Sequence, residues 1–160
     1  MKELMNAMID YYSGDAMRTQ HFIKVHSLAK LIGEMESISE KELFILESVA
    51  LVHDIGIKKA EAKYGSSDGK LQEELGPDIA KEMLMKLDYS NDDIERICYL
   101  VGHHHTYSNI QGVDYQILVE ADFLVNMYED KMSEISKKAA YEKIFKTKSG
   151  KKLCKVMYQL

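Results

Sequence analysis

A histidine and an aspartate stand side by side at the point where an apolar run ends, at His53 and Asp54. The run before them, Val49-Ala50-Leu51-Val52, is typical of a helix that buries one side, so the pair is expected at the edge of a core. Buried imidazole and carboxylate groups cost free energy unless they are paired or bound to a metal, and both are common ligands of divalent ions. An isolated His-Asp pair is more often structural, so its interpretation depends on the rest of the chain.

Two further potential ligands lie on or beside apolar stripes of other predicted helices. The stripe of residues 19–36 consists of Phe22, Val25, Ala29 and Ile32. His26 borders this stripe, whereas His21 lies five residues earlier, about 500° of helical rotation away, so His26 is predicted to be the inward-facing histidine. In the predicted helix 115–129, Asp122 sits beside Ala121 on the apolar stripe. Side chains on facing helices are how a helical bundle builds a metal site in its core.

Hydrophobic periodicity predicts that helices alone position these residues. A single proline and nine glycines favour long helices over a turn-rich β fold, and no segment alternates with the period of a strand. The helices are expected at about 2–12, 19–36, 40–54, 77–87, 91–101, 115–129 and 131–145. Ser39 and Glu42 form a capping-box pattern before the third of them, and Pro77 is expected in the first turn of the fourth. Residues 57–72 are interpreted as a polar, mobile loop near the His-Asp pair, and the last ten residues have no assigned structure.

The predicted architecture is therefore an all-α, single-domain bundle of about six to seven helices. It spans residues 1–160, with a motif-bearing core at about 18–130 and a basic helical segment at 131–160. A chain of 160 residues is long enough to bury a core of this kind.

Charge is distributed unevenly along the chain. The formal net charge is −5, but residues 131–160 hold nine lysines against two glutamates, a local +7, while residues 1–130 carry −12. A basic end can bind an anionic partner or nucleic acid. No aromatic and glycine pattern of a nucleic-acid binder accompanies it, so nucleic acid is disfavoured as a partner, and the favoured interpretation is a solvated helix face that packs on the acidic body.

The chain contains no apolar run of the roughly 18 to 20 residues that a membrane span needs, and no signal-peptide pattern, so no membrane partner is expected. Its two cysteines, Cys98 and Cys154, are far apart and in no CxxC arrangement. This is typical of a reducing compartment and favours a cytoplasmic protein. The sequence leaves the oligomeric state open, including a homo-oligomer.

The ordered set of His26, His53, Asp54 and Asp122 resembles the HD domain superfamily of metal-dependent phosphohydrolases. Members of that family carry a histidine on one helix, a His-Asp pair on the next and a distant aspartate. The resemblance covers residues 18 to 130 or so, and it implies that these four residues are ligands of a divalent ion: manganese, cobalt, nickel, iron, zinc or magnesium. It also implies that Asp54 is catalytic, orienting or deprotonating the attacking water.

The resemblance extends to the histidines that follow the fifth predicted helix. Some relatives carry adjacent histidines there that bind a second metal, and His104 and His105 match that region better than His103. The Gly-Tyr-Pro signature of the cyclic-dinucleotide branch is absent, and position 76 is a glycine where that branch has another histidine. His104 and His105 are therefore expected to bind either a second ion or the substrate phosphate. Lys58 and Arg18 are the nearest candidate cations for a phosphate.

The predicted function is hydrolysis of a phosphomonoester or pyrophosphate bond in a nucleotide or similar small phosphorylated metabolite. Two alternatives remain open. In one, the HD fold is a non-catalytic regulatory module that binds a metal or ligand and uses its basic segment to meet an anionic partner. In the other, the extra histidines make a di-iron oxygenase.

Overall fold

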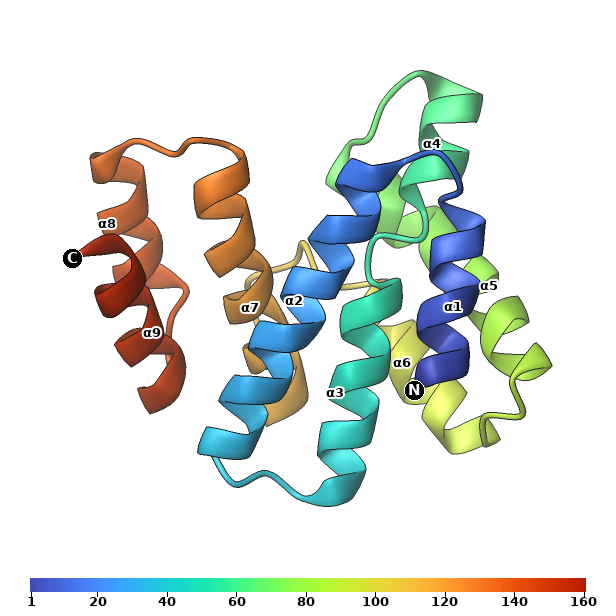
Figure 1. The fold of residues 1–160 in the computed structure, drawn as a ribbon, viewed down its shortest axis with the longest axis horizontal. Coiled ribbons are helices and arrows are strands. Elements are labelled where there is room, and N and C mark those ends of the chain that lie inside the picture. The colour runs from blue at the N-terminus through green and yellow to red at the C-terminus, as the bar shows by residue number, and fades with distance from the viewer.

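The computed structural model describes residues 1–160 and contains helices only (Figure 1), which confirms the all-α prediction. The helices are α1 (Lys2–Tyr11), α2 (Ala16–Met35), α3 (Glu40–Val52), α4 (Ile57–Tyr64), α5 (Gly69–Lys86), α6 (Asn91–Val101), α7 (Val113–Glu129), α8 (Glu134–Lys143) and α9 (Lys148–Tyr158). There are thus nine helices rather than six to seven. None of them is both long and apolar enough to cross a membrane.

The two additional helices are α4, in the expected loop, and α9, in the part of the basic segment where no separate helix was assigned. α4 occupies most of the expected loop, because Ile57 and Ala60 are buried one turn apart and Gly65, with φ 63°, ends the helix in the left-handed region. Its remaining residues are exposed and four of them are charged, so the apolar pattern in the sequence is weak. α9 occupies the unassigned C-terminal residues.

α5 begins at Gly69, not near Pro77, so the prediction for this start was wrong. Pro77 lies inside the helix, where it removes one backbone donor. Asp68 caps the observed start by accepting a hydrogen bond from the backbone N–H of Lys70. By contrast, the predicted capping box of α3 is present, with Ser39 and Glu42 bonding each other's backbone N–H groups.

One core cluster of 31 buried residues joins the helices. α2, α3 and α7 form its centre and pack against one another, while α6 and α1 pack on α3 (Figure 1). α3 is buried along most of its length, from Ile45 to Val52, which explains why its sequence is a nearly continuous apolar run. The C-terminal end of α3, which precedes His53 and Asp54, therefore lies in the middle of the molecule.

The basic segment forms one end of the molecule, beyond α7 (Figure 1). Of its nine lysines only Lys137 forms an ion pair, and its partner is Glu134 on the same helix. The others, Lys131, Lys138, Lys143, Lys146, Lys148, Lys151, Lys152 and Lys155, are exposed and unpaired. The lysines are thus solvated as expected, but they make no ion pairs with the acidic body.

A buried glutamate of α7 attaches the segment instead. Glu120 is fully buried, and its Oε1 accepts hydrogen bonds from the backbone N–H groups of Lys146 (2.6 Å) and Thr147 (2.9 Å) and from Gln116. Its Oε2 accepts from the hydroxyl of Thr147, the N-cap of α9. A Cβ atom at position 150 would collide with Glu120 Oε2, so glycine fits best there.

We expect Glu120→Gln to lower the free energy of unfolding by about 2 to 3 kcal/mol, because an amide puts an –NH2 donor in place of one carboxylate oxygen, so at least one donor that faces Glu120 loses its charged acceptor. Urea unfolding followed by circular dichroism measures this. Glu134→Gln makes the same chemical change on the exposed face of α8, and we expect an effect below about 0.5 kcal/mol there. Equal effects of the two substitutions would contradict the anchoring role of Glu120.

Candidate metal centre

The turn after α3 presents the His-Asp pair. α3 ends at Val52, and His53 and Asp54 follow in a turn that leads to α4. The chain before α2 holds this turn: the Tyr12 hydroxyl donates to the backbone carbonyl of Asp54 (2.7 Å) and the Tyr11 hydroxyl to that of Ile55 (3.2 Å). The positions of His53 and Asp54 are thus fixed by backbone contacts as well as by their own side chains.

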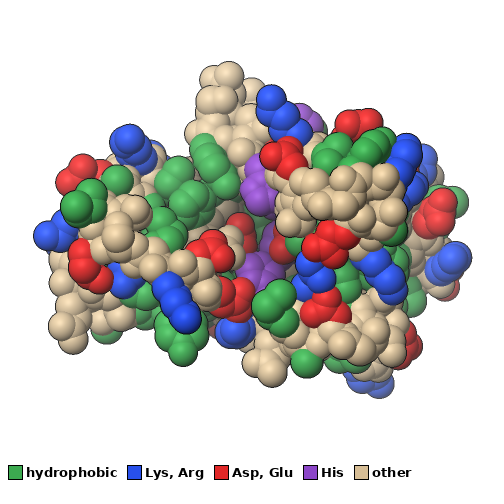
Figure 2. Space-filling view, turned by 90° about the horizontal axis from the view of Figure 1, so that it is seen from above, with side chains coloured by type: hydrophobic (Ala, Val, Ile, Leu, Met, Phe, Trp, Pro, Cys, Tyr) green, Lys and Arg blue, Asp and Glu red, His purple; other side chains and the backbone are tan.

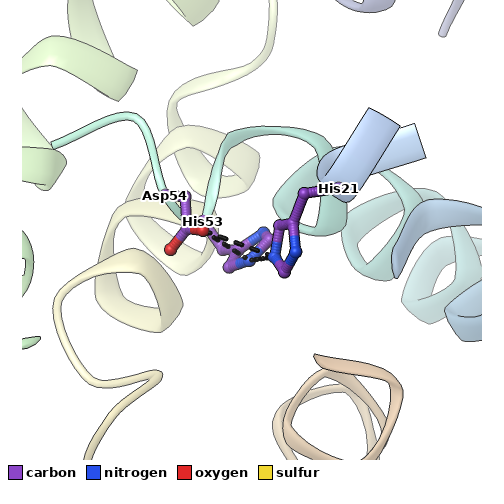
Figure 3. Close-up of side chains that lie close together, drawn as sticks. All are labelled: His21, His53 and Asp54. Carbon is purple, nitrogen blue, oxygen red and sulfur yellow. Dashed lines mark hydrogen bonds and ion pairs between the residues drawn. The ribbon is translucent and has the colours of Figure 1, made fainter. Parts of the chain in front are cut away.

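Four side chains converge on one point: one from α2, one from α7 and two from this turn. His21 Nε2 lies 3.3 Å from Asp122 Oδ1, 3.3 Å from His53 Nε2 and 3.4 Å from Asp54 Oδ2. His53 Nε2 lies 3.4 Å from Asp54 Oδ2 and 3.6 Å from Asp122 Oδ1. Figure 3 shows His21, His53 and Asp54 pointing toward one another. Ligand bonds of about 2.1 Å at tetrahedral angles would separate donor atoms by about 3.4 Å, and these five distances are close to that value. The ligand atoms of His21, His53 and Asp54 all lie within 4.8 Å of one another, and Asp122 adds a carboxylate oxygen beside both histidines.

The structure does not bring His26 into this group. His26 Nε2 lies 3.0 Å from Glu47 Oε1 on the opposite side of α2, next to Lys30. Counting from buried Val25, His26 is one residue away and rotated by about 100°, whereas His21 is four residues away and rotated by only about 40°. His21, not His26, therefore shares the buried face of α2, and the four-residue step to Val25 in the sequence is the signal that identifies it.

The hydrogen bonds of the histidines leave the converging nitrogens without protons when the rings are neutral. His53 Nδ1 donates to the Ala50 carbonyl (3.0 Å), and His21 Nδ1 lies 2.8 Å from Glu129 Oε2, also an acceptor. Each neutral ring therefore directs the lone pair of Nε2 at the other ring and at two carboxylates. A positive charge between these groups satisfies the arrangement, and a divalent ion fits it, because two neutral imidazoles and two carboxylates balance its charge.

A second group adjoins the first through Asp54. His104 is buried, its Nδ1 donates to the Val101 carbonyl (2.8 Å), and its Nε2 has no hydrogen-bond partner. That nitrogen lies 3.4 Å from Asp54 Oδ1, the oxygen that does not face His21. His105 completes a set of ligand atoms that lie within 4.8 Å of one another. His103 instead bonds the Tyr99 carbonyl and stacks on the Tyr99 ring.

The site lies at the floor of a cavity of about 330 Å³. Figure 2 shows histidines in a hollow of the surface, with acidic side chains beside them. Eleven residues line the cavity: Met17, Arg18, His21, Asp54, Ile57, Ser67, Gln72, His105, Asp122, Asn126 and Asp130. Only Met17 and Ile57 are apolar, so the cavity suits a small polar ligand. A larger hollow of about 520 Å³ between α2, α7 and α9 is mainly apolar and has no group of metal-ligand side chains.

The two candidate phosphate-binding cations differ in position. Arg18 lines the cavity, where its guanidinium donates to Asp15 and to Glu61 (2.6 Å). Lys58 is not among the lining residues. Its ammonium donates to the Tyr11 carbonyl (2.7 Å), so the structure does not bring Lys58 to the site.

The acidic surroundings shift the pKa values of the site histidines and aspartates. Burial opposes protonation of His21, but Asp122, Asp54 and Glu129 raise its pKa to about 9. Burial also opposes ionisation of Asp54, yet His53 and His104 lower the pKa of its carboxyl below the ordinary value. For His105, burial and the neighbouring His104 lower the pKa to about 4. Asp54 is thus a carboxylate and His105 a neutral imidazole at neutral pH.

The raised pKa of His21 predicts how the stability of the metal-free protein depends on pH. The unfolded pKa of histidine is about 6.5, so the stabilisation by protonated His21 is fully present below that pH and is lost as pH rises toward 9. We expect the free energy of unfolding in chelator to fall by about 2 to 3 kcal/mol between pH 6.5 and 9, as measured by urea unfolding. His21→Gln is expected to flatten this slope. A slope of the opposite sign in the unsubstituted protein would contradict the assignment.

Comparisons with known proteins bear on the fold. The HD domain family model matches residues 18–145. Among solved structures, the chain is similar to a crystal structure described as a predicted HD superfamily hydrolase from an uncultured Thermotogales bacterium, with a TM-score of 0.71 and 20% identity. The match covers 99% of this chain and 85% of that chain, and at this identity it shows a shared fold. No curated protein matches the chain.

Proposed function

The chain belongs to the HD domain family, and from this we propose that it is a metal-dependent phosphohydrolase. Its reaction is attack of water on a phosphomonoester or pyrophosphate bond of a nucleotide or similar small phosphorylated metabolite. One observation carries the proposal: two imidazole lone pairs and two carboxylates converge at the floor of a small polar cavity.

His21, His53, Asp54 and Asp122 hold the ion in this proposal, with His21 in the role that the sequence suggested for His26. When bound, a divalent ion lowers the pKa of water and offsets charge on the phosphoryl group. Histidine and carboxylate ligands accept manganese, cobalt, nickel, iron, zinc or magnesium. His104 and His105, with Asp54 between them and the first group, are the ligands of a second ion or contacts of the substrate phosphate.

Asp54 and Arg18 have the remaining roles. The low pKa of Asp54 makes it a hydrogen-bond acceptor that orients the attacking water rather than a strong base. Arg18 has five N–H donors, and its bonds to Asp15 and Glu61 leave others for a phosphate oxygen at the cavity wall. Bidentate contact of this kind fixes the orientation of a phosphoryl group.

A hydrolysis screen tests the proposal. The purified protein is offered nucleoside mono-, di- and triphosphates, cyclic nucleotides and a generic phosphomonoester, each with manganese, cobalt, nickel, iron, zinc, magnesium or chelator. Release of phosphate or pyrophosphate that requires a metal, and that Asp54→Ala abolishes with its helicity intact, supports the proposal and identifies the substrate class. Metal binding without turnover on any substrate counts against it.

The eight unpaired lysines favour one alternative, a regulatory module that binds an anionic partner through residues 131–160. Such a module holds metal and ligand without turnover, so the same screen separates it from a hydrolase. Iron content and dioxygen uptake, measured on the same samples, test the di-iron oxygenase.

A further inference from the structure

His21 differs from the other two buried histidines of the site in what holds its ring. His53 and His104 each follow the end of a helix, where the last backbone carbonyls have no helical partner, and their Nδ1 atoms donate to such carbonyls. His21 lies inside α2, where the carbonyls are already bonded. Its Nδ1 is bonded instead to a side chain, with Glu129 Oε2 2.8 Å away.

Glu129 joins the two helices that contribute ligands. It is the last residue of α7, seven residues and thus two turns after Asp122, so the two carboxylates share one face of that helix. Its other oxygen, Oε1, accepts from the ammonium of Lys24, which lies one turn after His21 on α2. Two groups of α2 therefore hold one carboxylate of α7, beside the point where His21 and Asp122 meet.

We infer that Glu129 is a positioning residue for the metal centre, with Lys24 holding its carboxylate in place. An ionised carboxylate only accepts hydrogen bonds, so it keeps the proton of neutral His21 on Nδ1 and leaves Nε2 as the ligand. A carboxylate behind a ligating imidazole also strengthens that ligand, and loss of such a partner commonly costs tenfold to a hundredfold in metal affinity. The inference rests on the proposed metal-dependent function, and it adds to the site a charged group that does not line the cavity.

The charge of Glu129 is the property that matters, so the informative substitution is Glu129→Gln, which keeps the shape of the side chain. The amide can accept through its oxygen or donate through its nitrogen, and a donated bond would place the His21 proton on Nε2. Lys24→Met keeps the Glu129 carboxylate but removes the ammonium that bonds its Oε1, so it tests whether Lys24 holds that carboxylate in place. Glu134→Gln, on the exposed face of α8, is the matched control for loss of one negative charge.

The experiment measures Co²⁺ binding by chelator competition and by the visible absorption of the bound ion, in each variant. Thermal unfolding with and without Co²⁺ is measured in parallel. We expect Glu129→Gln to weaken Co²⁺ binding about tenfold to a hundredfold and to reduce the shift in Tm that Co²⁺ causes. Lys24→Met is expected to bind Co²⁺ about threefold more weakly than the unsubstituted protein, and Glu134→Gln is expected to bind it equally well. A purely structural role would lower the Tm of the metal-free protein and leave the affinity of the folded protein unchanged.

The possible results separate this inference from the proposed function. If the unsubstituted protein binds no Co²⁺, Mn²⁺ or Zn²⁺, the proposed function fails and the inference fails with it. If it binds Co²⁺ and Glu129→Gln binds equally well with the same absorption spectrum, the inference alone is overturned. Equal weakening by Glu129→Gln and Glu134→Gln would also overturn it, because the effect would then come from net charge.

Discussion

Replacing Asp54 with asparagine is expected to lower the rate of the proposed metal-dependent hydrolysis by about a thousandfold or more. The two oxygens of this carboxylate serve different neighbours, since Oδ2 faces His21 and His53 while Oδ1 faces the unpartnered Nε2 of His104. An amide provides one oxygen and one –NH2 group, so at least one of these neighbours meets a donor in place of a negative charge. Steady-state kinetics at saturating metal measures the loss.

Asp130→Asn is the matched control for this substitution. Asp130 lines the same cavity but makes no ion pair with the histidines. We expect the turnover of Asp130→Asn to stay within about threefold of that of the unsubstituted protein, because exposed charges typically have small effects. If both asparagine variants lost activity equally, the cavity would need acidic charge in general rather than Asp54 in particular.

Replacing His21 with glutamine is expected to weaken divalent-metal binding by about a hundredfold or more, while His26→Gln leaves it within about twofold. His21 contributes one of the converging nitrogens, whereas His26 is paired with Glu47 on the far side of α2. Isothermal titration with Mn²⁺ or Co²⁺, supported by the metal content after dialysis, measures both. Loss of metal from His26→Gln with retention by His21→Gln would reverse the assignment.

Those two histidines illustrate how far the sequence alone determines the site. His53, Asp54 and Asp122 could be placed, because a polar residue within a strongly apolar run has few places to lie in a helical bundle. On α2, adjacency to Val25 favoured His26, whereas His21 was compared only with His26 and not with Val25. Each helical step is about 100°, so a border residue one position from a buried one can face outward while a residue four positions away faces in.

Other features depend on pairings across the chain that periodicity does not contain. The contact between His21 and Glu129 joins residues 108 positions apart, and nothing local in either segment indicates it. α4 was missed because only Ile57 and Ala60 of its residues are buried, too few to produce an apolar stripe. The attachment of the basic segment to α7 could not be predicted either, because Glu120, the carboxylate that makes it, looks in the sequence like an ordinary surface glutamate.

The hydroxyl groups of Tyr11 and Tyr12 that bond the turn at Asp54 and Ile55 have a consequence for where the working unit begins. The family match starts at residue 18, yet both tyrosines precede it. A protein trimmed to the matched boundaries would keep every proposed ligand and lose the two tyrosine hydrogen bonds to the turn that carries His53 and Asp54. We therefore expect a protein trimmed to residues 18–145 to hold His53 and Asp54 less firmly than the full chain, because residues 11 and 12 supply hydrogen bonds to the turn that carries both.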